Sequence, residues 1–326
     1  MKFSSILRAT ILLVLVSWVI WFFVGETQRH WNELSRVRMV FRWQYILVGE
    51  LLVFVDYLVV TLAWRDAILL ASNKKFTFVE SVGLVNISQL SKYLPGKVWS
   101  YAIQMHLLSA HDIAKACVLS VNVIMLLSLV TSATVIGLGY LVFANTYLPQ
   151  SVALALLAAS LAFYVFLFFG GTWSANVLMR LTNRLFKTRL ATIKVPTGGM
   201  VIVHGLFLAS NLSFGLAGYC IAVGIGLPPD LTLIAPIAAT MLLSNTIGLF
   251  AFFAPGGIGV REGVMYAMLK SAVDIQTCFI LPIAFRLVTT ICDLLLGSVA
   301  FVLLNRYAQK SGNQPHFKTR VAKIGE

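Results

Sequence analysis

The sequence predicts an all-α, polytopic integral membrane protein, and three observations predict it. Of the 326 residues, 59% are hydrophobic and only 11% are charged, less than half of the roughly 25% in soluble domains. Apolar stretches long enough to cross a bilayer recur along the chain. Two further apolar regions are interrupted in the middle by Pro-Gly. This composition excludes a soluble enzyme, a disordered tail and a fibrous repeat.

Six uninterrupted apolar segments are predicted to be full membrane spans. The first follows Lys2 and Arg8, as in a signal peptide, but no A-x-A-like cleavage site follows it. We therefore interpret it as an uncleaved span. The six segments are 6–24, 44–64, 116–143, 151–170, 200–226 and 279–304.

The two interrupted regions are predicted to be pairs of helices that meet at a break. Region 78–108 is broken at Pro95-Gly96, and region 231–269 is broken at Pro255-Gly256-Gly257. Proline lacks a backbone donor and clashes with the preceding turn, whereas glycine permits a positive φ. Both features end a helix.

The distribution of charge predicts the topology. The chain has 25 Lys and Arg against 12 Asp and Glu. Loop 171–199 and tail 306–326 are basic and should be cytoplasmic, whereas connections 144–150 and 227–230 contain no Lys or Arg and should lie outside. Both broken regions then become re-entrant hairpins that enter from opposite faces. The expected location is the cytoplasmic (inner) cell membrane, with both termini in the cytoplasm. The excess of basic residues is explained by the orientation of the protein in the membrane and by attraction to anionic lipid headgroups, rather than by nucleic-acid binding.

The order of segments predicts two inverted repeats within a single domain, 1–326. Residues 44–143 and 200–305 each contain a span, a broken hairpin and a span, in opposite orientations. Paired interrupted segments in two halves are typical of inverted-repeat transporters. Loop 26–43 disagrees with this topology, because it should be outside yet contains four arginines. It forms an amphipathic interfacial helix, or the first span is wrongly assigned.

The two breaks predict the position of a binding site. Non-helical backbone is tolerated at membrane depth only where it is buried in protein or lines a cavity. A helix that begins after a break offers unpaired N–H groups and a positive dipole end, which suit a phosphate. The candidate substrate-binding residues are Lys92, Pro95, Gly96, Lys97, Pro255, Gly256, Gly257, Arg261, Glu262 and Arg286.

Structural roles remain open for these charged residues. Each ionisable group in a span raises the free energy of membrane insertion by at least about 2.5–3.5 kcal/mol, so such a group is expected to be paired or to have a function. Lys97 and Arg261 are alternatively expected to reach the interface with their long side chains. The alternative for Arg286 is a structural pair with Asp293 or Glu262.

Other polar residues also have two interpretations. Glu50 and Asp56 in the second span pair with a lysine of the first hairpin or carry protons. A set of polar side chains beside the breaks either satisfies broken backbone or contacts substrate. This set comprises Asn86, Gln89, Ser244, Asn245 and Thr246.

No other chemistry is indicated. Gly257, Gly259 and Gly263 have the wrong spacing for a dinucleotide fingerprint. The four cysteines and five histidines are scattered without ligand spacing, so we expect no metal site and no cofactor. No catalytic triad or paired carboxylates are evident, which argues against an enzyme.

At the two breaks the sequence resembles a known family. Segment 87–99 (ISQLSKYLPGKVW) resembles the first signature of the lysylphosphatidylglycerol synthase transmembrane family, and segment 255–263 (PGGIGVREG) resembles the second. Their order, their separation and the following span with Arg286 also match. The resemblance implies a flippase-like membrane domain. In the name-giving members this domain is fused to a soluble aminoacyl transferase, and in archaeal relatives to glycosyltransferases that act on polyprenyl lipids.

These observations lead to one main functional hypothesis and two alternatives. The chain ends about twenty residues after its last span, so we expect no fused catalytic domain. The main hypothesis is translocation of a phospholipid or a lipid-linked glycan or aminoacyl lipid between leaflets, with an anionic lipid as substrate. The first alternative is a non-catalytic scaffold for a separate glycosyltransferase or lipid-modifying enzyme. The second is an ion-coupled solute transporter. The sequence predicts no oligomeric state.

Overall fold

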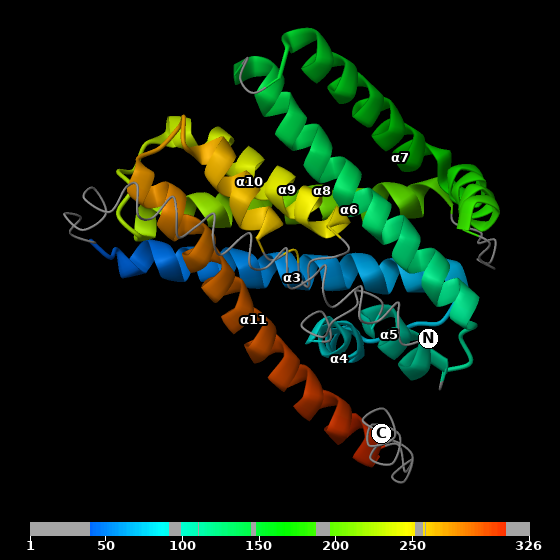
Figure 1. Ribbon diagram of the computed structural model, residues 1–326. Helices are drawn as coiled ribbons and strands as arrows, with labels where there is room; N and C mark the ends of the chain where they lie inside the picture. Colours follow the sequence, from blue (N-terminus) through cyan, green and yellow to red (C-terminus); the bar gives the residue numbers. More distant parts are fainter. Residues whose placement is uncertain are drawn as a thin grey trace, which may run out of the picture.

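The computed structural model describes residues 40–90, 99–109, 111–144, 148–186, 196–251, 257 and 259–310. Within these ranges the chain is helical and contains no strand, so the predicted all-α membrane fold is confirmed (Figure 1). The elements are α3 (Trp43–Ser72), α4 (Phe78–Gln89), α5 (Trp99–Ser109), α6 (Lys115–Ala144), α7 (Gln150–Phe186), α8 (Thr197–Gly224), the 3-10 turn η2 (Leu231–Leu233), α9 (Ile234–Phe250), α10 (Val260–Leu269) and α11 (Ile275–Lys310).

Six helical segments of the described chain are long and apolar enough to cross a membrane. Five of them correspond to predicted spans. The sixth, Leu231–Phe250, is the first arm of the second broken region. The predicted span at 6–24 and most of loop 26–43 lie outside the described residues. The six segments are Trp43–Ser72, Lys115–Ala144, Gln150–Leu181, Thr197–Gly224, Leu231–Phe250 and Ile275–Leu303.

Each broken region consists of two helices, as predicted. The first gives α4 and α5, and the second gives α9 and α10. Helix α4 starts at a capping box, in which Thr77 Oγ1 accepts a hydrogen bond from the Glu80 N–H, and the Glu80 carboxylate accepts one from the Thr77 N–H. These two bonds satisfy donors that the first turn leaves unpaired. Of the central residues of the two breaks, Gly257 is described, whereas Pro95, Gly96, Pro255 and Gly256 lie outside the described ranges.

The prediction of a loop from residue 171 was wrong. Gly171 adopts φ 50° and ψ −132° and bends α7 sharply, but the helix continues to Phe186. The segment after the bend is held by packing, because one of its faces is buried against α6 and α8. The basic composition that suggested a loop belongs to the opposite face, where Arg180 and Arg184 are exposed. The packed residues are Ala175, Leu178 and Met179 with Ile124 and Met200.

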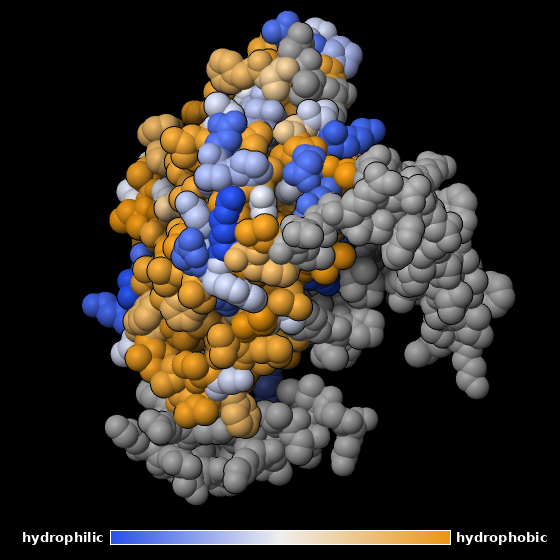
Figure 2. Space-filling model, turned by 90° about the vertical axis from the view of Figure 1, so that its left-hand side faces the viewer, coloured by the Kyte–Doolittle hydropathy of each residue, from blue (hydrophilic) through white to orange (hydrophobic). Residues whose placement is uncertain are grey.

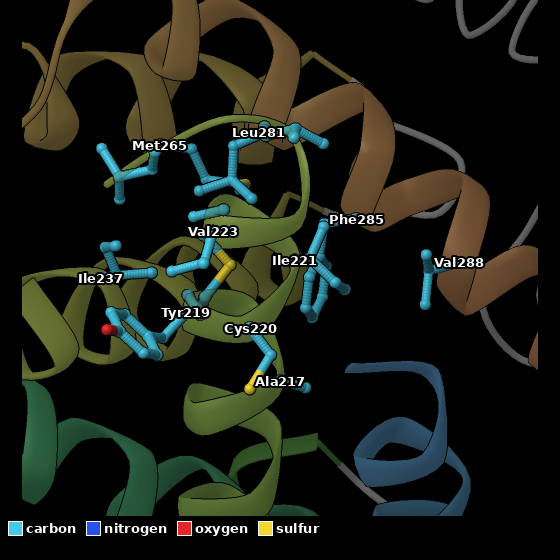
Figure 3. Close-up of a cluster of buried hydrophobic side chains, with 14 of the residues drawn as sticks. Ala217, Tyr219, Cys220, Ile221, Val223, Ile237, Met265, Leu281, Phe285 and Val288 are labelled. Atoms are coloured by element: carbon cyan, nitrogen blue, oxygen red, sulfur yellow. The ribbon is translucent and has the colours of Figure 1, made fainter. Parts of the chain in front are cut away.

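Helices α3 and α8 form the most extensive pairing in the fold. Glycines bring the two helices into close contact. A Cβ placed on Gly49 would lie 2.6 Å from Ile221 Cγ1, and one on Gly224 would lie 2.5 Å from Ile46 Cγ1. Ile221 also belongs to a hydrophobic cluster that includes residues of α9, α10 and α11. Figure 3 shows Ile221 and Phe285 among the side chains of this cluster.

The other helices pack around this central pair in a reciprocal pattern. Helix α4 packs against α11, and α9 packs against α6; α5 contacts α6, and α10 contacts α11. Figure 1 shows α4 and α5 toward the C-terminal end of α3, and α9 and α10 toward its N-terminal end. The arms before the two breaks therefore each pack against a span from the other half of the chain.

The outer surface of the helices is strongly apolar. Figure 2 shows mainly hydrophobic residues over the described part of one face, with hydrophilic residues confined to patches. Large apolar side chains are exposed on α3, α7, α8 and α11, among them Leu47 at 68% and Ile283 at 67%. A surface of this kind is stable against lipid chains rather than water.

We predict that Gly49→Ala destabilises the protein. The added methyl group would overlap Ile221 and lie 3.3 Å from the Ala217 carbonyl oxygen, and overpacking of this kind costs about 1–3 kcal/mol. The thermal unfolding midpoint in detergent should fall. The matched control is Gly205→Ala on α8, where a Cβ would meet no atom within 4 Å. There the higher helix propensity of alanine should raise the free energy of unfolding by up to about 1 kcal/mol. Equal effects at both positions would contradict close packing of α3 on α8.

Candidate functional site

The start of α10 is organised around the carboxylate of Glu262. Its Oε2 accepts a hydrogen bond of 2.6 Å from the Gly259 N–H, and its Oε1 accepts one of 3.0 Å from Arg286 Nη1 on α11. Gly259 lies at φ 85° and forms the N-cap of α10. The side chains of Arg286 and Glu262 are 30% and 14% exposed. One carboxylate thus caps α10 and joins it to α11.

The neighbouring Arg261 lies over two aromatic rings. Its guanidinium carbon lies 5.8 Å from the ring centroid of Phe214 on α8 and 5.5 Å from that of Phe285 on α11. The two rings meet edge to face, with centroids 5.0 Å apart. Cation–π contacts of this kind stabilise a guanidinium where water is scarce. Arg261 is therefore positioned by α8 and α11 together.

Glycine at two positions lets the second break lie against α9. Gly257 has φ 72°, and a Cβ on it would lie 2.8 Å from the Gly248 carbonyl oxygen. A Cβ on Gly248 would in turn lie 3.1 Å from Arg261 Cβ. A larger residue at either position would push the start of α10, and with it Arg261, away from α9.

A group of acidic and hydroxyl side chains lies next to Arg261. Asp56 and Asp293 are 6% and 5% exposed. The Ser210 hydroxyl on α8 donates a hydrogen bond to Asp56 Oδ1, and Tyr57 is hydrogen-bonded to Asp293. Arg261 interacts electrostatically with Tyr57 and Asp293. Charged groups from α3, α10 and α11 thus meet inside the helical domain.

The structure brings together the described residues of the predicted site. Gly257, Arg261, Glu262 and Arg286 surround the start of α10. Of the two partners predicted for Arg286, the structure shows an ion pair with Glu262. The expectation of unpaired N–H groups at this helix start was wrong for Gly259, because Glu262 accepts its hydrogen bond. The other predicted site residues, namely Lys92, Pro95, Gly96, Lys97, Pro255 and Gly256, lie outside the described residues.

Sequence reasoning missed the residues that position the charges. Ser210, Phe214 and Phe285 were not singled out, because a serine or phenylalanine inside a span is unremarkable by itself. Tyr57 was also missed, although it directly follows Asp56. Only the pairing of α3 with α8 and of α10 with α11 reveals their role.

The described residues contain no group of three or more His, Cys, Asp or Glu side chains that would hold a metal ion. The four cysteines are buried and form no disulfide: Cys117, Cys220, Cys278 and Cys292.

We predict that Glu262→Gln lowers stability by about 1–3 kcal/mol, because it leaves the partly buried Arg286 without its carboxylate. The thermal midpoint of the purified protein measures the effect. The double variant Glu262→Gln/Arg286→Gln should lose less than the sum of the two single losses, since groups in direct contact are coupled. Strictly additive losses would show that the ion pair contributes nothing to stability.

Comparison with known proteins shows the family of this chain. The family model described as the lysylphosphatidylglycerol synthase TM region matches residues 6–297. A search of curated proteins finds no match to the chain. The matched region includes both broken regions, the ion pair and every membrane span found in the described residues, except residues 298–303 of the last span. The chain therefore belongs to the lysylphosphatidylglycerol synthase TM region family.

Proposed function

We propose that this membrane protein moves an anionic lipid, a phospholipid or a lipid-linked glycan or aminoacyl lipid, from one leaflet of the bilayer to the other. The observation that carries the proposal is the arrangement of Arg261 and Arg286 at the start of α10, within a membrane domain whose family is related to lipid handling. Lys92, Lys97 and the glycines and prolines of the two breaks complete the proposed headgroup site.

Glu262 supports this proposal because its carboxylate is bound as a phosphate would be. It accepts hydrogen bonds from a helix N-terminus and from an arginine, the two kinds of donor that proteins use for phosphate. A headgroup phosphate would compete for the same donors. Glu262 would then turn toward a neighbouring cation, and it would return when the lipid leaves. The donors of the site would be paired with an anion both with and without the lipid, which suits a protein that must release its substrate.

The reciprocal packing supports inverted repeats, and we propose 44–143 and 200–305 as the two units of the single domain. Each unit would contribute one re-entrant hairpin. The first arm of each hairpin packs against a span of the other unit, α4 against α11 and α9 against α6. Hairpins from opposite faces would give the headgroup a polar route accessible from both sides. In this topology both termini lie in the cytoplasm, and the protein resides in the cytoplasmic membrane.

The apolar exterior supports a route in which the lipid chains never leave the bilayer. Exposed Leu and Ile side chains cover α11, including Leu287 and Leu295 at 61% and 56%. Each CH₂ group withdrawn from hydrocarbon into water would cost about 0.8 kcal/mol, so a lipid with long chains crosses at tolerable cost only if its headgroup alone is enclosed. The polar site needs to accommodate no more than that headgroup.

We predict that Arg286→Gln and Arg261→Gln abolish transfer of a fluorescent anionic phospholipid across liposomes that contain the purified protein. The charge that would bind the phosphate is lost, although expression and folding persist. The readout is dithionite quenching of lipid in the outer leaflet.

Arg65→Gln is the matched control. Arg65 is 33% exposed and forms a 3.0 Å ion pair with Asp66, so it resembles Arg286 in burial and pairing but lies on α3, away from α10. Its loss should leave transfer unchanged. Full activity of both Arg261 and Arg286 variants would refute the site. A scaffold would instead be supported if substitutions in 171–199 abolished binding of a separate enzyme while Arg261 and Arg286 were dispensable for that binding.

A further inference from the structure

The two parts of α7 expose different kinds of side chain. Residues 150–170 extend for about 30 Å at 1.5 Å per residue, which equals the thickness of the hydrocarbon layer. Every exposed residue from 152 to 169 is Val, Leu, Ala or Phe. The helix then bends at Gly171, and Figure 1 shows the last turns of α7 at an angle to its long first part. The bend therefore lies where a helix of this length leaves the hydrocarbon layer.

The bend is fixed by contact with the start of α8. Gly171 has a positive φ, which glycine adopts without the steric cost that other residues meet. A Cβ on Gly171 would also lie 2.7 Å from Thr197 Oγ1. On the other side of the bend, the Ser174 hydroxyl donates a hydrogen bond of 3.1 Å to the Gly171 carbonyl oxygen. The change of direction is thus specified by the fold.

Exposed aromatic side chains lie on both sides of the bend. Phe169 precedes it, and Trp173 follows it with 66% of its surface exposed. The Trp173 ring meets the ring of Phe166 edge to face, with centroids 5.2 Å apart. Tryptophan is enriched at the boundary between acyl chains and headgroups, because its ring is apolar and its N–H is polar. These aromatic residues agree with a bend at that boundary.

The helix after the bend has one face packed on protein and one face exposed. Its packed face is the one buried against α6 and α8. Among the described side chains of residues 172–186, the exposed ones are Trp173, Arg180, Leu181 and Arg184. With about 100° between successive residues, these four lie within an arc of about 100°. They form a single surface, the Trp173 face, and residues 172–186 contain no Asp or Glu.

We propose that the Trp173 face binds the anionic headgroups of the surrounding leaflet, so that residues 172–186 form an interfacial helix. In a helix of this kind the apolar side chains lie among the upper acyl chains and the basic side chains lie among the phosphates. The lipids concerned surround the protein and are not the transported substrate. The inference therefore goes beyond the proposed function and does not depend on it.

The charge of the Trp173 face favours lipid over a second copy of the chain. In a two-fold symmetric dimer the same patch contacts itself, so Arg180 and Arg184 of both copies would be brought together. Like charges in contact destabilise an interface. Anionic phosphates instead complement the two arginines, and the exposed tryptophan and leucine fit the acyl chains beneath them.

The test measures which lipid lies next to the Trp173 face. A fluorophore is attached at Leu181→Cys in the full chain, in liposomes of phosphatidylcholine and phosphatidylglycerol, one of which carries a nitroxide quencher near its headgroup. Leu181 is 50% exposed, and the native cysteines are buried, so the label should be selective. Phosphatidylglycerol should quench at an about fivefold lower mole fraction, the effect of about one arginine near an anionic surface. Salt at about 1 M should reduce this preference by screening.

Two double variants test the role of charge. Arg180→Gln/Arg184→Gln should be quenched equally by both lipids, whereas Arg180→Lys/Arg184→Lys should keep the preference because it keeps both charges. Both arginines are exposed, so these variants should fold. The matched control is a fluorophore at Leu161→Cys, which is 47% exposed on the first part of α7. Residues 150–170 contain no charge, so this probe should show no preference.

Three outcomes would overturn the proposal. The first is equal quenching of the Leu181 probe by both lipids, or a preference that survives the glutamine double variant. The second is quenching by neither lipid, and energy transfer between labelled chains would then assign the face to a second copy. The third is loss of the preference in Arg286→Gln, which would show that the probe detects lipid at the proposed transport site. An intact preference in Arg286→Gln supports a separate surface, whether or not the protein transfers lipid.

Discussion

The fold depends on one constraint: a polar group inside the hydrocarbon layer has no water with which to form hydrogen bonds. An unsatisfied backbone or side-chain group there costs several kcal/mol. The start of α10 meets this constraint with a single residue, since Glu262 accepts from both the Gly259 N–H and Arg286. The same need places the Ser210 hydroxyl on Asp56. These hydrogen bonds can form only when α10 packs against α11 and α3 packs against α8.

The same constraint explains why a satisfied site can still be a binding site. In water, exchange of a carboxylate for a phosphate would gain little, because both are well solvated. In a low-dielectric interior these donors need an anion, so under the proposed function a lipid phosphate would enter only as Glu262 withdraws. The partial exposure of Arg286, at 30%, leaves its guanidinium open to such an exchange. Arg261 has its own contacts with Phe214 and Phe285, so under the proposed function it would stay in place while Arg286 changes partners.

The sequence contained enough information for the membrane fold and only part of the site. Hydropathy located five described spans, and Pro-Gly located the two interrupted pairs of helices. The Glu262–Arg286 pair was one of two open alternatives, because an ionisable residue in a span needs a partner and few are within reach. The hydrogen-bond network in which Gln104 of α5 joins side chains of α3, α4 and α6 was not predictable. Its other members lie 16 to 40 residues from Gln104 in the chain, and neutral amides have no spacing that marks them. The helix beyond Gly171 was missed because tertiary packing, rather than composition, stabilises it.

The two broken regions combine similar packing with different chemistry. In the second half, an acidic residue of α10 meets an arginine of α11; in the first half, an amide of α5 meets an amide of α6. Each pair thus joins the helix after a break to the next span. A repeat used twice for packing alone would need no such difference, since neutral pairs would satisfy both halves at lower desolvation cost. Keeping the charged pair in one half is therefore an energetic burden that packing does not require. It is understandable if the second half alone binds the charged part of a ligand, as the proposed function requires.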